Sequence, residues 1–157
     1  MQLKDIFSKK KVEIKIKGID YYGVSFEVFI YDKENSEHLI FLVPKWELYN
    51  FAKSLIEIND NSKNIEFSAD DEEFGEIWSY FSISIKKIKN ISASYVQLEY
   101  SYIRDKEIEQ LINFFKSEEY DNILFDYPIC KKECFYTSIE NLQNFAKEIL
   151  FEMDKLS

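Results

Sequence analysis

The side chains that most often do acid–base or nucleophilic chemistry are scarce in this 157-residue chain, which has one histidine and two cysteines. Any Ser–His or Cys–His mechanism would have to use His38, because it is the sole imidazole. The sequence has no glycine-rich phosphate loop, no GxSxG elbow and no HExxH motif. His38 follows Glu37 at the start of a predicted strand, so we expect an exposed or edge-strand histidine and not a catalytic group.

The two cysteines, Cys130 and Cys134, are separated by three residues in CKKEC. A metal site would need further ligands of the right type, and His38 is far away in the sequence. A disulfide could close so short a loop, but a reducing compartment favours two free thiols. We therefore expect no catalytic residue, no metal site and no cofactor.

Carboxylates are abundant, and their densest run is DDEEFGE at residues 70–76. This run lacks the alternating oxygen ligands of an EF-hand loop, and no pair stands out as the acid and nucleophile of a glycosidase. An enzyme stays open as an alternative, which would require a deep pocket with convergent polar groups. The sequence favours a protein that is not an enzyme.

The formal net charge is −9 and the sequence pI is about 4.8. This charge repels phosphate backbones and attracts cationic surfaces, so direct binding to nucleic acid is disfavoured. It either keeps a protein soluble or attracts a basic protein partner. No segment reads as a signal peptide or approaches the roughly 18 apolar residues of a membrane span, which predicts a cytoplasmic protein.

Residues 1–157 are predicted to form a single globular domain, because three glycines and two prolines favour regular elements joined by short turns. Strands are predicted where apolar and polar residues alternate, as in KVEIKIK at residues 11–17. The main predicted strands are 11–17, 24–31, 38–43, 77–88, 91–103 and 123–128, with a further short strand at 132–136. Three of these strands precede the first predicted helix.

Three amphipathic helices are predicted, at residues 44–58, at 105–119 and from residue 137 onward. Thr137 and Glu140 match a capping box at the start of the last one. The first and last helices share a pattern, LYNFAKSL at 48–55 and LQNFAKEI at 142–149. Convergence on one packing solution explains this better than duplication, because the predicted strands ahead of each copy differ in number and length.

These elements predict an α+β fold with a largely antiparallel sheet of about six to seven strands and three amphipathic helices packed mainly on one face. The opposite face would carry aromatic anchors among polar side chains, beside an acidic loop that steers a cationic partner. The predicted partner-binding residues are Asp70, Asp71, Glu72, Glu73, Glu76, Trp78, Tyr80, Tyr95, Gln97 and Glu99. The alternatives are that a loop or the last helix covers this face, and that the acidic run is only a solvated turn.

The first helix reads W-x-L-x-x-F-A-x-x-L, and the last helix echoes it. The residues are Trp46, Leu48, Phe51, Ala52 and Leu55, echoed by Leu142, Phe145, Ala146 and Ile149. With the acidic composition and the strand groups that precede each helix, this layout resembles the immunity proteins of bacterial polymorphic and contact-dependent toxin systems, including the WapI-type group.

The resemblance implies a cytoplasmic, stoichiometric inhibitor that binds a cognate toxin domain and blocks its active site or substrate entry. A nuclease-type toxin would be basic because it holds phosphates, so an acidic inhibitor could compete for that surface by charge. No catalytic residue carries over. The alternative is a non-enzymatic interaction or structural module of a bacterial cytoplasmic complex.

Overall fold

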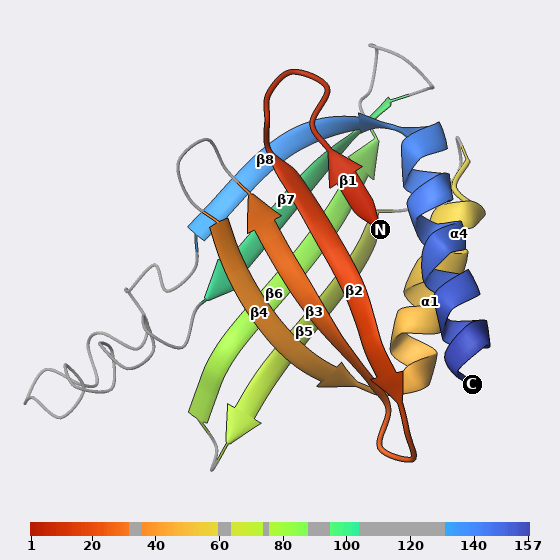
Figure 1. Ribbon diagram of the computed structural model, residues 1–157. Coiled ribbons are helices and arrows are strands. Elements are labelled where there is room, and N and C mark those ends of the chain that lie inside the picture. The colour runs from red at the N-terminus through yellow and green to blue at the C-terminus, as the bar shows by residue number, and fades with distance from the viewer. Residues whose placement is uncertain (32–35, 60–63, 74–75, 88–94, 104–130) are drawn as a thin grey trace, which may run out of the picture.

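The computed structural model describes residues 1–31, 36–59, 64–73, 76–87, 95–103 and 131–157, which form eight strands and two helices (Figure 1). The side chains of residues 36–37, 71–80, 87, 101–103 and 131–132 lie outside this description. The strands are β1 (Gln2–Lys4), β2 (Lys11–Ile19), β3 (Val24–Tyr31), β4 (Ser36–Val43), β5 (Ile65–Glu73), β6 (Glu76–Lys87), β7 (Tyr95–Ile103) and β8 (Lys131–Ser138). The helices are α1 (Lys45–Ile56) and α4 (Ile139–Leu156).

The strands form two separate four-stranded sheets, so the prediction of a single sheet of six to seven strands is wrong. Sheet A has the order β1-β2-β3-β4 and sheet B the order β5-β6-β7-β8, and every neighbouring pair is antiparallel. The α+β class and the antiparallel pairing are confirmed. The run 70–76, which was expected to be a loop, instead supplies the end of β5 and the start of β6.

The apolar faces of the two sheets pack against each other. Figure 1 shows sheet A in front of sheet B, with the strands of one crossing those of the other. Val12, Ile14 and Phe26 on sheet A and Phe81 and Leu98 on sheet B are almost completely buried. The rings of Phe26 and Phe67 lie 6.0 Å apart and join the two sheets directly. Each apolar face is therefore covered by the other sheet, and not by helices as expected.

The two helices lie side by side and close one side of this sandwich (Figure 1). They are antiparallel: Lys45 Nζ at the start of α1 donates to Ser157 Oγ at 2.9 Å, and Gln143 Nε2 near the start of α4 donates to the Ile56 carbonyl at 3.1 Å. The predicted apolar stripes are buried, which confirms them. They consist of Leu48, Phe51, Ala52 and Leu55 on α1 and Leu142, Phe145, Ala146, Ile149 and Met153 on α4.

One detail of the helix prediction, the N-cap of α4, differs from the structure. The N-cap of α4 is Ser138, whose Oγ accepts from the Asn141 N–H at 3.0 Å, whereas Thr137 is buried in β8. The third predicted helix (105–119) and the predicted strand 123–128 lie outside the described residues, as does Cys130. The part of the chain that is described contains two helices.

The two halves of the described chain share one arrangement. In each half, four antiparallel strands follow one another in sequence order and lead directly into a helix that carries the LxNFAK pattern. The first half has four strands before its helix, because Gln2–Lys4 adds a strand that the sequence did not reveal. Among the described residues, four strands precede each copy of the helix, but residues 88–94 and 104–130 ahead of the second copy lie outside the description, so the expected difference in strand number stays a prediction.

Gly23 allows the β2–β3 turn to approach the junction of β4 and α1. Its φ is +147°, and a Cβ at this position would lie 2.1 Å from the Val43 carbonyl oxygen. Any other residue would collide with the backbone there. This contact fixes one end of sheet A against the start of α1.

Candidate protein-interaction face

The outward-facing side of sheet B is here called the acidic face. Along β5, which supplies one edge of this face, exposed and buried side chains alternate. Glu66, Ser68 and Asp70 are exposed, whereas Phe67 and Ala69 between them are buried against the core. This alternation follows from the period of two in a strand, with the apolar side turned toward sheet A. The carboxylates of Glu66 and Asp70 therefore stand in solvent on one surface.

The register of β5, β6 and β7 shows which predicted site residues are neighbours. Asp70 lies opposite Tyr80, and Tyr80 lies opposite Ile103. Asp71 pairs with Ser79 and Glu72 with Ile77, so Trp78 is an additional residue at a bulge. Bulges of this kind re-aim side chains locally. The carboxylate-bearing residues from Asp70 to Glu76, here called the acidic hairpin, thus lie at the same end of sheet B as Trp78 and Tyr80 in the backbone register.

Tyr95 lies at the other end of the sheet. It pairs with Ser138 at the start of β7, eight residues before Ile103. At about 3.3 Å per residue, these two ends of β7 are about 26 Å apart. The structure therefore separates the predicted site into an acidic end with Trp78 and Tyr80 and a second end with Tyr95. Tyr95 is 39% exposed, in agreement with its predicted outward orientation.

Gln97 and Glu99 occupy the middle of the acidic face and are half-buried. Gln97 Nε2 lies 2.8 Å from Cys134 Sγ on β8, so this amide already contacts a thiol of its own sheet. Glu99 stands in a row with Glu66 and Ser84, which pairs with both of them across β6. The buried neighbours Val96, Leu98 and Tyr100 confirm the predicted inward side of β7.

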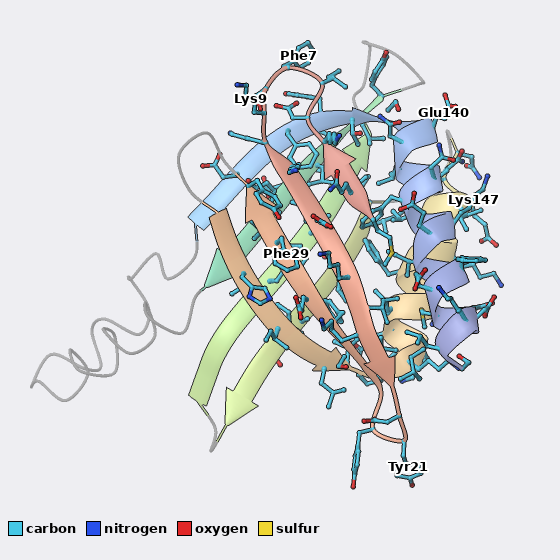
Figure 2. The ribbon with its side chains drawn as sticks, in the orientation of Figure 1. Phe7, Lys9, Tyr21, Phe29, Glu140 and Lys147 are labelled. Atoms are coloured by element: carbon cyan, nitrogen blue, oxygen red, sulfur yellow. The ribbon has the colours of Figure 1, made fainter. Side chains whose placement is uncertain are left out.

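Sheet A presents a different outer surface, here called the lysine–aromatic face. Lys11 Nζ lies 4.4 Å from the ring centre of Tyr31, and Lys15 Nζ lies 5.1 Å from that of Phe29. The ring of Phe29 is stacked with that of His38 at 4.5 Å. These cations and rings largely pair with one another, and Figure 2 shows Phe29 in the middle of the face.

Glu27 contacts two basic side chains on this face. Lys17 Nζ lies 3.0 Å from one of its oxygens and His38 Nε2 3.0 Å from the other. The hydrogen bond from Lys17 lowers the pKa of Glu27, partial burial opposes this, and the contact with His38 lowers it further. His38 is exposed on the edge strand β4, as expected, and its partners are structural ones.

Charge is unevenly distributed between the two sheets. The strands of sheet B contain eight acidic and four basic residues, and five of the eight acidic residues belong to the acidic hairpin. The strands of sheet A contain three acidic residues and four lysines. Sheet B therefore has a net formal charge of −4 and sheet A one of +1, so of the two sheets it is sheet B that attracts cations.

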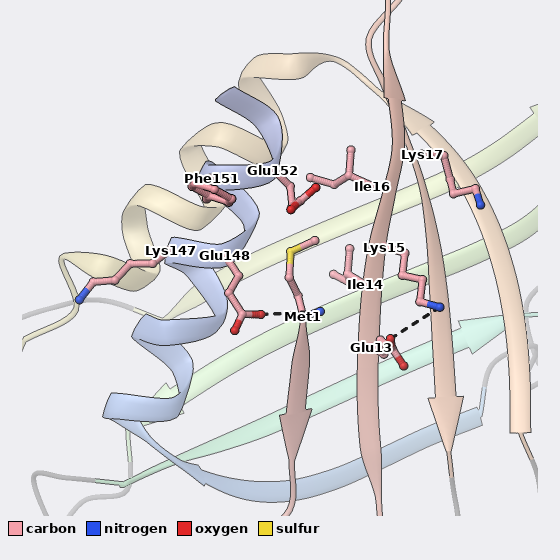
Figure 3. A pocket seen from close by; sticks show the side chains of 10 residues that line it. All are labelled: Met1, Glu13, Ile14, Lys15, Ile16, Lys17, Lys147, Glu148, Phe151 and Glu152. Atoms are coloured by element: carbon pink, nitrogen blue, oxygen red, sulfur yellow. Dashed lines mark ion pairs between the residues drawn. The ribbon is translucent and has the colours of Figure 1, made fainter. Parts of the chain in front are cut away.

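Among the described residues, surface grooves lie on either side of the helix pair. The β2–α4 groove has a volume of about 680 Å³ and is lined by Met1, Ile14 and Ile16 on one side and by Phe151 and Glu152 of α4 on the other (Figure 3). Glu148 forms an ion pair with the N-terminal ammonium of Met1 at 3.7 Å. The α1–β5 groove has a volume of about 520 Å³ and includes Trp46 and Glu47.

Trp46 is a surface residue, although it opens the W-x-L-x-x-F-A-x-x-L pattern whose other residues are buried. Its exposed fraction is 64%. Its position two residues before Leu48 is outside the buried i, i+3, i+4, i+7 stripe of α1, so the helical period itself contained the signal.

Other chemistry is limited in the described residues. They include no group of three or more His, Cys, Asp or Glu side chains placed to hold a metal ion. Cys134 is a free thiol. Among the same residues, neither helix has the length and apolar character needed to cross a membrane.

Comparisons with known proteins give weak structural likenesses and no match in sequence. No protein-family model matches the chain, and no curated protein matches it. The chain is similar to a chain in a solved structure described as a CdiA-CT/CdiI toxin and immunity complex from Enterobacter cloacae, with a TM-score of 0.40 and 14% identity. The match covers 88% of this chain and 98% of the other. At this level, the likeness does not establish a shared fold or function.

Proposed function

We propose that this protein is an immunity-type inhibitor that binds a cognate, basic toxin domain, such as a nuclease domain, and covers its active or substrate-binding surface. The observation that carries the proposal is the concentration of carboxylates on one sheet of a two-sheet sandwich. A nuclease domain must present cations to hold phosphates, so a surface of opposite charge can occupy the same site. The role requires tight binding and no catalytic residues.

The two ends of the acidic face have separate tasks in this proposal. The acidic hairpin attracts the basic partner over a distance of about a Debye length, which speeds encounter. Trp78, Tyr80 and Tyr95 then act as aromatic anchors, which mainly slow dissociation. Because the ends lie about 26 Å apart along β7, a partner that engages both must cover most of the sheet.

The role is tested by capture followed by a growth assay. The immobilised chain, incubated with a lysate of its native organism, should retain a basic protein that inhibits growth when it is expressed alone. Co-expression of this chain should restore growth. A captured partner that is acidic, or growth inhibition that co-expression leaves unchanged, would contradict the proposal.

The proposed anchors are tested by replacing Trp78 and Tyr80 with alanine. Folding, followed by circular dichroism, should stay intact, and binding of the captured toxin domain should weaken by more than about 2 kcal/mol. Loss of folding in the double variant would show that these side chains belong to the core, which would remove them from the site.

A second candidate function is a structural or adaptor subunit without a toxin partner. It is favoured by exposed aliphatic side chains on β4, where Ile40 is 58% and Leu42 is 51% exposed. These residues lie on the lysine–aromatic face, away from the acidic face. A partner retained through Ile40 and Leu42, and insensitive to salt, would support this reading.

A further inference from the structure

Among the described residues, the two edges of sheet B differ in whether backbone hydrogen bonds from outside the sheet reach them. At the β8 edge, the Ile6 N–H donates to the Tyr136 carbonyl at 3.0 Å and the Tyr136 N–H donates to Asp5 Oδ1 at 3.1 Å. At the β5 edge, no backbone–backbone hydrogen bond beyond the ladder with β6 reaches Ile65–Asp70 from any other described residue. In the part of the chain that is described, alternate residues of β5 therefore direct toward the side away from β6 backbone N–H and C=O groups that no other strand pairs.

The α1–β5 groove runs beside this open edge. Phe51 of α1 and Phe67 of β5 lie in its lining, and their rings are stacked with centres 4.8 Å apart. Trp46 lies on the α1 side with most of its ring in solvent. A groove of about 520 Å³ beside a strand edge has room for an extended segment, with an indole available for contact.

The charged side chains of the α1–β5 groove indicate which kind of segment it would bind. Among the described residues that line it, the charged ones are Glu47 and Glu66, and none is a lysine or an arginine. The β2–α4 groove, in contrast, is lined by three lysines and three glutamates and has no such sign. A second copy of the chain is a poor occupant, because pairing two β5 edges would bring the carboxylates of Glu66 and Asp70 close to those of the other copy.

We propose that the α1–β5 groove receives an extended segment of the partner, with alternating basic and apolar residues, that adds to sheet B as a strand beside β5. Apolar side chains of the segment pack against Trp46, and its cations face Glu47 and Glu66. This inference rests on the proposed function, because it names how the basic partner binds. In this arrangement, part of the contact with the partner lies at the β5 edge of sheet B and not on the flat acidic face.

The test uses synthetic peptides and the full chain, labelled for residue-level hydrogen exchange by NMR. The peptide KVKTKVK alternates lysine with apolar or neutral residues, KKKKVTV has the same composition in blocks, and EVETEVE reverses the charge. At low salt, KVKTKVK should slow the exchange of alternate amides in Ile65–Asp70 at least about tenfold, because strand addition protects every second N–H. The other two peptides should bind at least about fivefold more weakly.

Trp46→Ala and Phe151→Ala form a matched pair, since both remove an exposed aromatic from a groove. Trp46→Ala should weaken KVKTKVK at least about fivefold, and Phe151→Ala should leave it within about twofold. Equal binding of KVKTKVK and KKKKVTV, protection elsewhere than β5, or no binding of KVKTKVK would overturn strand addition.

The peptide result and the capture result are independent. Capture of a toxin domain without β5 protection overturns this inference alone. Protection of β5 by KVKTKVK without any basic toxin partner supports the groove as a strand-binding site and contradicts the immunity role.

Discussion

Sheets A and B share strand number, strand order and a closing helix, yet their outer surfaces have opposite character. On sheet A, lysines lie over aromatic rings and Glu27 is contacted by Lys17 and His38, so charges are largely satisfied within the face. On sheet B, carboxylates outnumber cations two to one and gather at one end. The inner faces explain the fold, and the difference between the outer faces is what points to a partner.

If both sheets share one core, Phe67→Ala should destabilise the protein more than any other change proposed here. Phe67 is buried and contacts Phe26 of sheet A and Phe51 of α1. Its truncation should lower the free energy of unfolding by about 3–5 kcal/mol, through lost burial and a residual cavity. Urea denaturation followed by circular dichroism measures this.

Phe29→Ala is the control for this prediction, because Phe29 is half-buried on the outer face of sheet A. Its cost should stay below about 1.5 kcal/mol. Two separate unfolding transitions in either variant would show that the sheets do not share a cooperative core.

The junction of sheet A with α1 is tested by Gly23→Ala, with a smaller expected loss of about 2 kcal/mol. The added methyl group would lie 2.1 Å from the Val43 carbonyl oxygen in a strained backbone conformation. Gly18→Ala is the matched control, since its nearest neighbour would be Ser25 Oγ at 3.7 Å, an ordinary contact. Similar melting temperatures for the two variants would contradict the close approach of the turn to the junction.

The loop that joins sheet A to the β8 edge is tested by Asp5→Asn, with the smallest effect. Burial alone would raise the pKa of Asp5, but hydrogen bonds from Ser8 Oγ and from the N–H groups of Tyr136 and Phe7 outweigh it and hold the pKa below its usual value. The charged form is therefore favoured by folding. Asp5→Asn should cost about 1 kcal/mol at pH 7.

The contribution of the Asp5 carboxylate to stability should depend on pH. A lowered pKa means that the stabilisation is present above the ordinary aspartate pKa of about 3.9 and is lost as the pH falls through the lower folded value. The difference between the wild-type protein and Asp5→Asn should therefore shrink in acid denaturation series below about pH 4. A difference that stays constant from pH 7 to pH 3 would show that the carboxylate charge plays no part.

Which side of each strand is buried could be predicted from the sequence, but what covers that side could not. Alternation in KVEIKIK correctly assigned Val12 and Ile14 to the core, and the helical period correctly assigned Leu48 and Phe145. An apolar face, however, is equally satisfied by a helix layer or by a second sheet. That ambiguity is why a single sheet was expected where two sheets pack face to face.

The candidate site shows a similar limit. Outward orientation of Tyr95 followed from its strand pattern, but its distance from Asp70 depends on the β6–β7 register, and a period of two does not fix the register between strands. The bulge at Trp78 and the open edge of β5 are likewise properties of pairing. The exposure of Trp46, in contrast, could have been read from its helical phase.

The most direct test of the central claim compares the same change of charge on the two outer faces. Glu66→Lys with Asp70→Lys alters the acidic face, and Glu13→Lys with Glu27→Lys makes an equal change on sheet A. Calorimetric titration with the captured toxin domain at low salt should show a loss of at least about 100-fold for the first pair and less than about threefold for the second. Equal losses, or a larger loss for the sheet A pair, would contradict the assignment of partner binding to sheet B.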